Sequence, residues 1–162
     1  MNKTPIIGVM GPGEGASEYD ADTAFEIGRR IAELNWIILT GGRNSGVMEA
    51  AMKGAKSVHG LTIGILPDMG ESTSPYVDIP IITGLGNARN AINILSSDLI
   101  IAIGTGLGTT SEIALAMKSN KSVLLLNQTP ESSTFFSSFN YKQLYFPKSI
   151  SEAIALAFQL LN

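Results

Sequence analysis

The sequence contains no cysteine and only one histidine. The lack of cysteine excludes disulfide bonds and thiolate zinc sites, and a single histidine argues against a histidine-based metal centre. No cluster of carboxylates points to a metal site either, so we predict that the chain holds no metal ion of its own. The lack of cysteine also fits a reducing compartment, and we predict a cytoplasmic location.

Long apolar runs and basic patches are also missing. No apolar run reaches the roughly 18 residues needed to cross a bilayer. Pro5, Gly8 and Gly11 interrupt the short N-terminal run too early for a secretory signal. The chain has 11 Lys and Arg against 14 Asp and Glu, a formal net charge of −3. Without a basic surface to follow phosphates, we predict a protein that binds neither nucleic acid nor membrane.

What the sequence does contain is a globular composition rich in glycine. It has 162 residues, of which 44% are hydrophobic, 15% are charged and 17 are glycine. This length suits one domain with a substantial core, so we predict a single domain over residues 1–162. The glycines cluster at the ends of apolar runs, which indicates loops that approach a ligand closely.

Short apolar runs alternate along the chain with segments of helical periodicity. This alternation predicts an α/β fold, Rossmann-like and doubly wound, in which helices cover both faces of a mainly parallel sheet. The pattern places strands over 5–10, 36–40, 62–66, 79–83, 99–103 and 122–126, helices over 18–34, 47–57, 87–96, 109–118 and 149–161, and a Ser/Thr/Phe-rich loop over 128–140.

Four glycine-rich loops follow predicted strands, over residues 11–15, 41–46, 84–86 and 104–108. In open parallel sheets ligands bind beyond the carboxyl ends of the strands, so we expect these loops to converge on one site. The first loop does not match the dinucleotide pattern G-x-G-x-x-G, and no acidic residue clearly follows the second strand to bind a ribose. We therefore do not expect NAD or FAD; a tight strand-to-helix turn explains this loop equally well.

The most informative loop reads Gly-Thr-Gly-Leu-Gly-Thr-Thr-Ser-Glu over residues 104–112. It follows a pure apolar run and opens a helix, where free backbone N–H groups and the helix dipole favour negative charge. Thr109, Thr110 and Ser111 add hydroxyl groups. Glu112 fits a helix-capping pattern, but it is also a candidate ligand contact or catalytic acid–base. We predict that a small anionic molecule binds here.

Two further segments add cationic and polar groups. Residues 41–47 read Gly-Gly-Arg-Asn-Ser-Gly-Val and give a second anion-friendly helix start, in which Arg43 is either a ligand contact or solvated surface. Arg89 lies in the first turn of a predicted helix, where the dipole disfavours a cation, so it holds either an anion or a salt-bridge partner. The predicted ligand contacts are Gly11, Gly13, Gly15, Gly41, Gly42, Asn44, Gly46, Val47, Arg89, Asn90, Gly106, Gly108, Thr109, Thr110 and Glu112.

Together these segments resemble the superfamily once labelled lysine decarboxylases, whose best-known members are the "lonely guy" cytokinin-activating phosphoribohydrolases. Those enzymes carry a P-G-G-x-G-T-x-x-E motif and an upstream E-R-K segment. Here residues 104–106 read Gly-Thr-Gly, and Arg89 lies between Ala88 and Asn90. Arg89 and Glu112 match the catalytic pair of the enzymes, so the resemblance leaves open a nucleoside 5′-monophosphate phosphoribohydrolase that uses these two residues.

Residues 86–90 and the string over 104–116 are more similar to another branch, the molybdenum cofactor carrier proteins. That resemblance implies a protein without catalytic residues that stores and protects molybdenum cofactor for molybdoenzymes, with molybdoenzymes or cofactor-synthesis proteins as partners. The cofactor has a phosphate, a pterin and an oxo-molybdenum group, which suits anion-binding loops. The resemblance also implies a homo-oligomer, a dimer or tetramer, for which Ile92, Leu95 and residues 113–117 offer apolar helix faces. Because the acid and lysine flanking the enzyme arginine are absent, we favour the carrier over the hydrolase.

Overall fold

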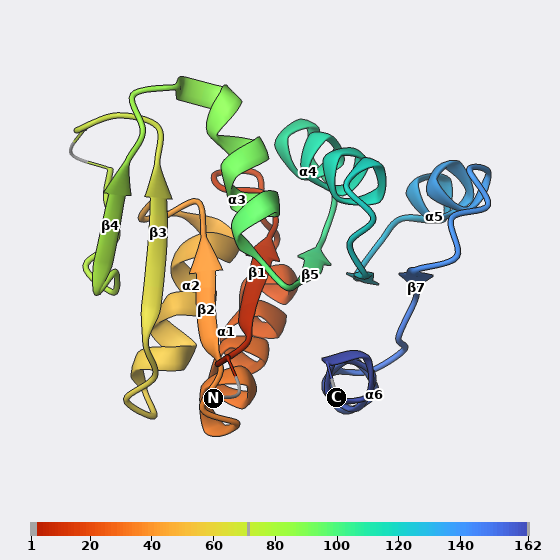
Figure 1. The fold of residues 1–162 in the computed structure, drawn as a ribbon, viewed down its shortest axis with the longest axis horizontal. Coiled ribbons are helices and arrows are strands. Elements are labelled where there is room, and N and C mark those ends of the chain that lie inside the picture. The colour runs from red at the N-terminus through yellow and green to blue at the C-terminus, as the bar shows by residue number, and fades with distance from the viewer. Residues whose placement is uncertain (1–2, 71, 162) are drawn as a thin grey trace.

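The computed structural model describes residues 3–70 and 72–161. Its centre is a seven-stranded sheet in the order β4-β3-β2-β1-β5-β6-β7, and every pairing is parallel. This architecture confirms the predicted Rossmann-like α/β fold (Figure 1). The strands are β1 (Ile6–Met10), β2 (Ile37–Thr40), β3 (Thr62–Leu66), β4 (Ile79–Ile82), β5 (Leu99–Ile103), β6 (Val123–Leu126) and β7 (Leu144–Tyr145).

Helices cover both faces of the sheet, and each face has its own apolar core. Helices α1, α2 and α6 pack on one face, and α3, α4 and α5 pack on the other. Within the described ranges, no helix has both the length and the apolar character needed to cross a membrane. The helices are α1 (Glu18–Glu33), α2 (Gly46–Lys56), α3 (Asn90–Ser96), α4 (Leu107–Lys118), α5 (Pro130–Ser137) and α6 (Ile150–Leu161), with a 3₁₀ turn η1 (Gly86–Arg89) before α3.

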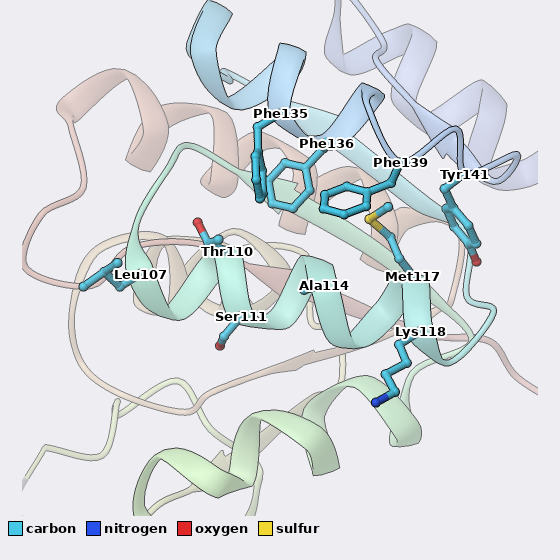
Figure 2. Close-up of a pocket in the computed structure, with 10 residues that line it drawn as sticks. All are labelled: Leu107, Thr110, Ser111, Ala114, Met117, Lys118, Phe135, Phe136, Phe139 and Tyr141. Atoms are coloured by element: carbon cyan, nitrogen blue, oxygen red, sulfur yellow. The ribbon is translucent and has the colours of Figure 1, made fainter.

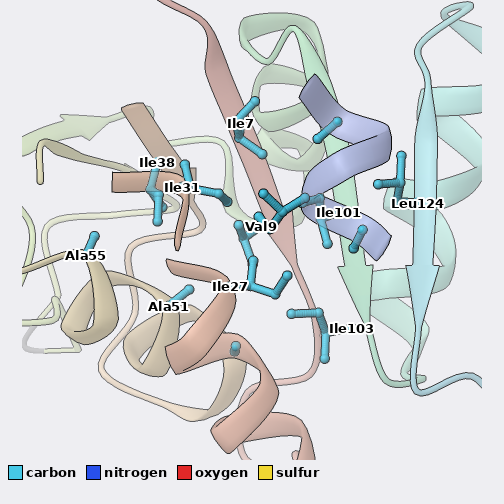
Figure 3. Close-up of a cluster of buried hydrophobic side chains, with 14 of the residues drawn as sticks. Ile7, Val9, Ile27, Ile31, Ile38, Ala51, Ala55, Ile101, Ile103 and Leu124 are labelled. Atoms are coloured by element: carbon cyan, nitrogen blue, oxygen red, sulfur yellow. The ribbon is translucent and has the colours of Figure 1, made fainter. Parts of the chain in front are cut away.

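The central strands are buried on both sides, which explains their unbroken apolar sequences. All five residues of β5 are buried. Figure 3 shows the larger core, in which Ile7 and Val9 of β1 and Ile101 of β5 belong to one cluster with Ile27 of α1. This core fixes the central strands in place, and the loops that follow β1, β2 and β5 leave from one edge of the sheet.

Residues 128–140 differ from the prediction, because they contain helix α5 rather than only a loop. Thr129 caps this helix by accepting a hydrogen bond from the Ser132 N–H at 3.2 Å, and Pro130 begins the first turn. Phe136 is 2% exposed and packs in the second core. The helix therefore depends on tertiary burial that a Ser/Thr-rich composition does not reveal. Strand β7 was also not predicted, and its two residues are too few to show a period.

Helices α1 and α2 approach each other most closely at two glycines. A Cβ atom added to Gly54 would lie 1.9 Å from the Phe25 carbonyl oxygen. One added to Gly28 would lie 2.0 Å from the Ala51 carbonyl oxygen. Neither position accepts a side chain unless the two helices move apart.

We expect Gly54→Ala to lower the free energy of unfolding by about 2 to 3 kcal/mol, because the helices must separate to admit the methyl group. For a chain of this size that corresponds to a fall in Tm of about 5 to 10 °C in a thermal melt. Gly15→Ala is the matched control, since no heavy atom lies within 4 Å of its added Cβ. Equal melting temperatures for the two variants would contradict the prediction.

Candidate functional site

The candidate site lies where the strand order reverses. β1 lies between β2 and β5, and the helices that follow β1 and β5 pack on opposite faces of the sheet. Such a switch point opens a crevice at the carboxyl ends of the strands. A cavity of about 380 Å³ occupies this position, and we call it the glycine trough. Its lining residues are Gly11, Pro12, Gly13, Gly15, Met48, Asn87, Arg89, Asn90, Thr105, Gly106, Leu107, Gly108, Thr109 and Glu112.

The first turn of α4 forms one wall of the glycine trough. Gly106 is the N-cap residue of this helix, and it provides no side-chain hydrogen bond to the first N–H groups. Thr109 is 2% exposed, and its Oγ1 has no hydrogen-bond partner among the residues that the structure describes. A buried hydroxyl without a partner is rare and unfavourable. The helix start and this hydroxyl together fit an oxygen-rich anion.

Arg89 supplies a buried positive charge at the same cavity. Its side chain is 8% exposed, and Nη1 donates hydrogen bonds of 2.6 Å to the carbonyl oxygens of Gly41 and Ile65. Burial lowers the pKa of Arg89, and the nearby Glu112 charge opposes that shift. No ion pair involves Arg89 within residues 3–70 and 72–161. Of the two alternatives predicted for Arg89, the geometry therefore favours an anion over a salt bridge.

Glu112 is the acidic group of the glycine trough. It is 7% exposed, and its Oε1 accepts a 2.8 Å hydrogen bond from Asn93 Nδ2. Burial raises the pKa of Glu112 to about 7, against the opposing effects of the Asn93 hydrogen bond and the Arg89 charge. At neutral pH this side chain is therefore divided between the acid and the carboxylate. It does not cap α4, since the helix begins at Leu107, five residues earlier in the chain.

A second cavity of about 370 Å³ adjoins the glycine trough, and we call it the arginine pocket. It is formed mainly by the loop between β2 and α2, with Arg43, Asn44 and Ser45. The two cavities have Gly13, Met48 and Arg89 in common. The remaining lining residues of the arginine pocket are Glu14 and Ser72.

Ten of the predicted contacts line one of these two cavities, and the other five do not. Gly41 lies behind Arg89, where an added Cβ would be 2.2 Å from Nη1. Gly42 has a φ of +73° and packs against Gly64. Both glycines give room to neighbouring groups and do not reach the ligand space. The ten are Gly11, Gly13, Gly15, Asn44, Arg89, Asn90, Gly106, Gly108, Thr109 and Glu112.

Gly46 and Val47 pack against the loop that follows β1. Gly46 has a φ of +54°, and an added Cβ would lie 2.1 Å from the Gly13 carbonyl oxygen. Val47 is fully buried, and its N–H donates a 3.0 Å hydrogen bond to the Pro12 carbonyl oxygen. These two residues therefore position the loop after β1 and line neither cavity.

Thr110 faces away from the glycine trough. It lines a separate apolar cavity of about 500 Å³ between α4 and α5. Figure 2 shows it on the side of α4 that faces Phe135, with Phe139 and Met117 farther along the same cavity. Successive side chains of a helix lie about 100° apart, and here Thr109 lines the glycine trough while Thr110 lines the cavity beside α5.

Met48 and Asn93 are among the contributors to the site that sequence reasoning missed. Met48 was not among the predicted contacts, yet it lines both cavities. Asn93 is fully buried on α3 between Ile92 and Ile94, and it holds Glu112 in place. An asparagine within an apolar helix face was the available signal, because a buried amide needs a polar partner.

Residues 4–154 match the SLOG cluster4 family. The molybdenum cofactor binding protein from the phototrophic bacterium Rippkaea orientalis has a similar structure. Its TM-score is 0.96 and its identity 51%, over 99% of each chain. The molybdenum cofactor carrier protein from Chlamydomonas reinhardtii is 49% identical, with a TM-score of 0.93 over 98% of this chain and 99% of that one.

Two curated proteins match the chain at lower coverage. An uncharacterized protein from Archaeoglobus fulgidus is 46% identical over 120 residues, 74% of this chain and 78% of that protein. A cytokinin riboside 5′-monophosphate phosphoribohydrolase from Mycobacterium tuberculosis is 30% identical over 95 residues, 57% of this chain and 51% of that protein. These similarities confirm the predicted resemblance, including the greater likeness to the carrier branch. The chain belongs to the SLOG cluster4 family.

Proposed function

We propose that this chain binds molybdenum cofactor in the glycine trough, protects it, and delivers it in the cytoplasm to molybdoenzymes. The observation that carries the proposal is the juxtaposition of three anion-binding groups at one cavity. These groups are the start of α4 without a side-chain cap, the unpartnered Thr109 hydroxyl and the buried Arg89 guanidinium. Similarity over almost the whole chain to a cofactor binding protein and a cofactor carrier protein supports the same function.

The chemistry of the glycine trough suits the parts of this cargo. Backbone N–H groups at the start of α4 and the Thr109 hydroxyl would hold the phosphate, with Arg89 supplying the balancing charge. In its acid form Glu112 would donate a hydrogen bond to a cargo oxygen. Asn87 and Asn90 line the same cavity and offer amide groups to the pterin. The glycine trough and the arginine pocket, of about 380 and 370 Å³, fall in the size range of small-molecule sites.

Titration of the purified protein with molybdenum cofactor tests the proposal. We expect saturable binding, followed by restored activity when the complex is mixed with a cofactor-free molybdoenzyme. Thr109→Val removes only the unpartnered hydroxyl, and we expect it to weaken binding about 10-fold. Thr134→Val on α5 is the matched control and should bind like the wild type. Absence of binding by the wild-type protein would reject the proposal.

A phosphoribohydrolase is the second candidate function. It is favoured by the position of Glu112, with a pKa near 7, beside Arg89 in one cavity. Glu112 would serve as the acid–base for N-glycosidic cleavage, while Arg89 would orient the phosphate-bearing sugar. Prolonged incubation with AMP should then release free adenine, and Glu112→Gln should abolish that release. If concentrated protein releases no base from purine monophosphates, this activity is ruled out for those substrates.

We also propose that the chain acts as one domain in a homo-oligomer, a dimer or tetramer. Large apolar side chains remain exposed on the α3, α4 and α5 side, with Leu95 at 65%, Leu107 at 93% and Phe139 at 59%. Exposed apolar side chains on neighbouring helices support a protein interface on this side. Of the apolar helix faces predicted for contact, Ile113 is instead 1% exposed and belongs to the core. Light scattering after size-exclusion chromatography measures the subunit number directly.

A further inference from the structure

The arginine pocket contains charged groups of both signs, and none of them belongs to an ion pair among residues 3–70 and 72–161. In the described part of the chain, neither Glu14 nor Arg43 forms an ion pair or a side-chain hydrogen bond. Arg43 nevertheless lies close enough to Arg89 for its charge to lower the pKa of that residue. A carboxylate and two guanidinium groups therefore face one cavity while remaining available to a ligand.

Arg43 extends from a backbone that is held on both sides. The Asn44 N–H donates a 2.7 Å hydrogen bond to the Ser72 carbonyl oxygen, and the Ser74 N–H donates one of 2.9 Å to the Gly42 carbonyl oxygen. Arg43 itself forms an antiparallel bridge with Thr73. Its side chain is exposed and lines the arginine pocket, while the backbone from which it extends is held by these bonds.

The arginine pocket shares one wall with the glycine trough. Met48 and Gly13 line both cavities. A Cβ on Gly13 would lie 2.6 Å from Ser45 Oγ and 3.4 Å from Met48 Cε, so a side chain at this position would crowd the wall that the two cavities share. Met48 offers an adaptable apolar surface against which a flat ring can pack. A ligand whose phosphate lies at α4 can therefore place a ring in the arginine pocket.

We infer that the arginine pocket recognises an amino-oxo pyrimidine edge, in which a ring N–H lies between an amino group and a ring carbonyl. A carboxylate accepts two hydrogen bonds side by side, which matches Glu14 to the amino group and the ring N–H. A guanidinium only donates, which matches Arg43 to the ring carbonyl oxygen. The pterin of the proposed cargo carries this edge, and so does guanine, whereas adenine lacks both the carbonyl and the ring N–H.

This inference rests on the proposed function for its natural ligand, but it is testable without molybdenum cofactor. GMP and AMP share the sugar phosphate and differ in the edge that Glu14 and Arg43 would contact. We expect calorimetry to show that the wild-type protein binds GMP about 10-fold more tightly than AMP. Glu14→Gln should remove that preference by weakening GMP binding about 10-fold, with AMP binding within about 2-fold of the wild type.

Matched variants isolate the effect of charge. Glu131→Gln on α5 makes the same charge change as Glu14→Gln at an exposed position and should retain the GMP preference. Arg43→Gln should also remove the preference, and Lys142→Gln is its control. Equal affinity of the wild type for GMP and AMP overturns the inference, as does a GMP preference that survives Glu14→Gln. If either result is found but molybdenum cofactor binds, the proposed function is retained and only this inference is rejected. If GMP is preferred as expected but molybdenum cofactor does not bind, the proposed function is rejected and this inference is retained.

Discussion

Replacing Arg89 by alanine is expected to weaken the binding of molybdenum cofactor about 100-fold and to lower the free energy of unfolding by about 2 to 4 kcal/mol. The first effect follows from the loss of a desolvated charge at the glycine trough. The second follows because the carbonyl oxygens of Gly41 and Ile65 both lose their donor, Nη1 of Arg89. Cofactor titration measures the first effect, and urea unfolding measures the second.

Arg89→Lys separates the two roles. Lysine keeps the positive charge but cannot reproduce the planar fork, so we expect about a 10-fold loss of affinity and a smaller loss of stability than for alanine. Arg30→Ala, on the solvent-facing side of α1, is the control for the removal of an arginine. If Arg89→Ala remained folded and bound the cofactor as the wild type does, the anion would have to lie elsewhere.

Glu112→Gln is expected to change how stability depends on pH. The folded-state pKa of Glu112 is about 7, above its ordinary value of 4.5. Between these values the folded chain retains a proton that the unfolded chain has released, so wild-type stability falls as pH rises through this window. The shift corresponds to about 3 kcal/mol of lost stability by pH 7. Glutamine does not titrate, so the Glu112→Gln variant does not lose this stability as pH rises.

Urea unfolding at pH 4.5, 5.5, 6.5 and 7.5 measures the effect. The stability of Glu112→Gln relative to the wild type should rise by about 3 kcal/mol across the window and then level off. The new amide also faces Asn93, whose Oδ1 has no partner within the described residues, and it can donate a hydrogen bond there. Glu131→Gln, at an exposed position of α5, is the matched control. A constant difference for Glu112→Gln would mean that the buried carboxyl is not protonated in the folded state.

Most of the fold follows from local sequence pattern. A buried parallel strand has to be apolar on both faces, and β5 shows this in all five residues. The strand order depends on long-range packing and was found only in the structure. Helix α5 was not predicted for a similar reason, because its position depends on the packing of Phe136 against a sheet formed by distant segments.

The residues of the candidate site were predicted less completely than the fold. The sequence around Gly106 and Thr109 was sufficient to predict a helix start with free N–H groups, and both residues line the glycine trough, because a helix that follows a buried strand begins at the carboxyl end of that strand. Whether a glycine lines a cavity or supports a neighbour depends on contacts between separate loops. Gly46 illustrates this, since its role is set by Gly13, which lies in another loop of the chain. Asn93 likewise becomes functional only through Glu112, one helix away.

The close packing of the loop after β1 against the loop after β2 affects how a bound cargo would be released. A Cβ added to Gly46 would lie 2.1 Å from the Gly13 carbonyl oxygen, and the Val47 N–H donates a hydrogen bond to the Pro12 carbonyl oxygen. Folding therefore preorganises this wall before any cargo arrives, and little loop entropy is lost on capture. The residence time of the cargo then depends on the bonds it breaks with rigid amides and guanidinium groups. An acceptor protein would have to compete for those bonds one by one.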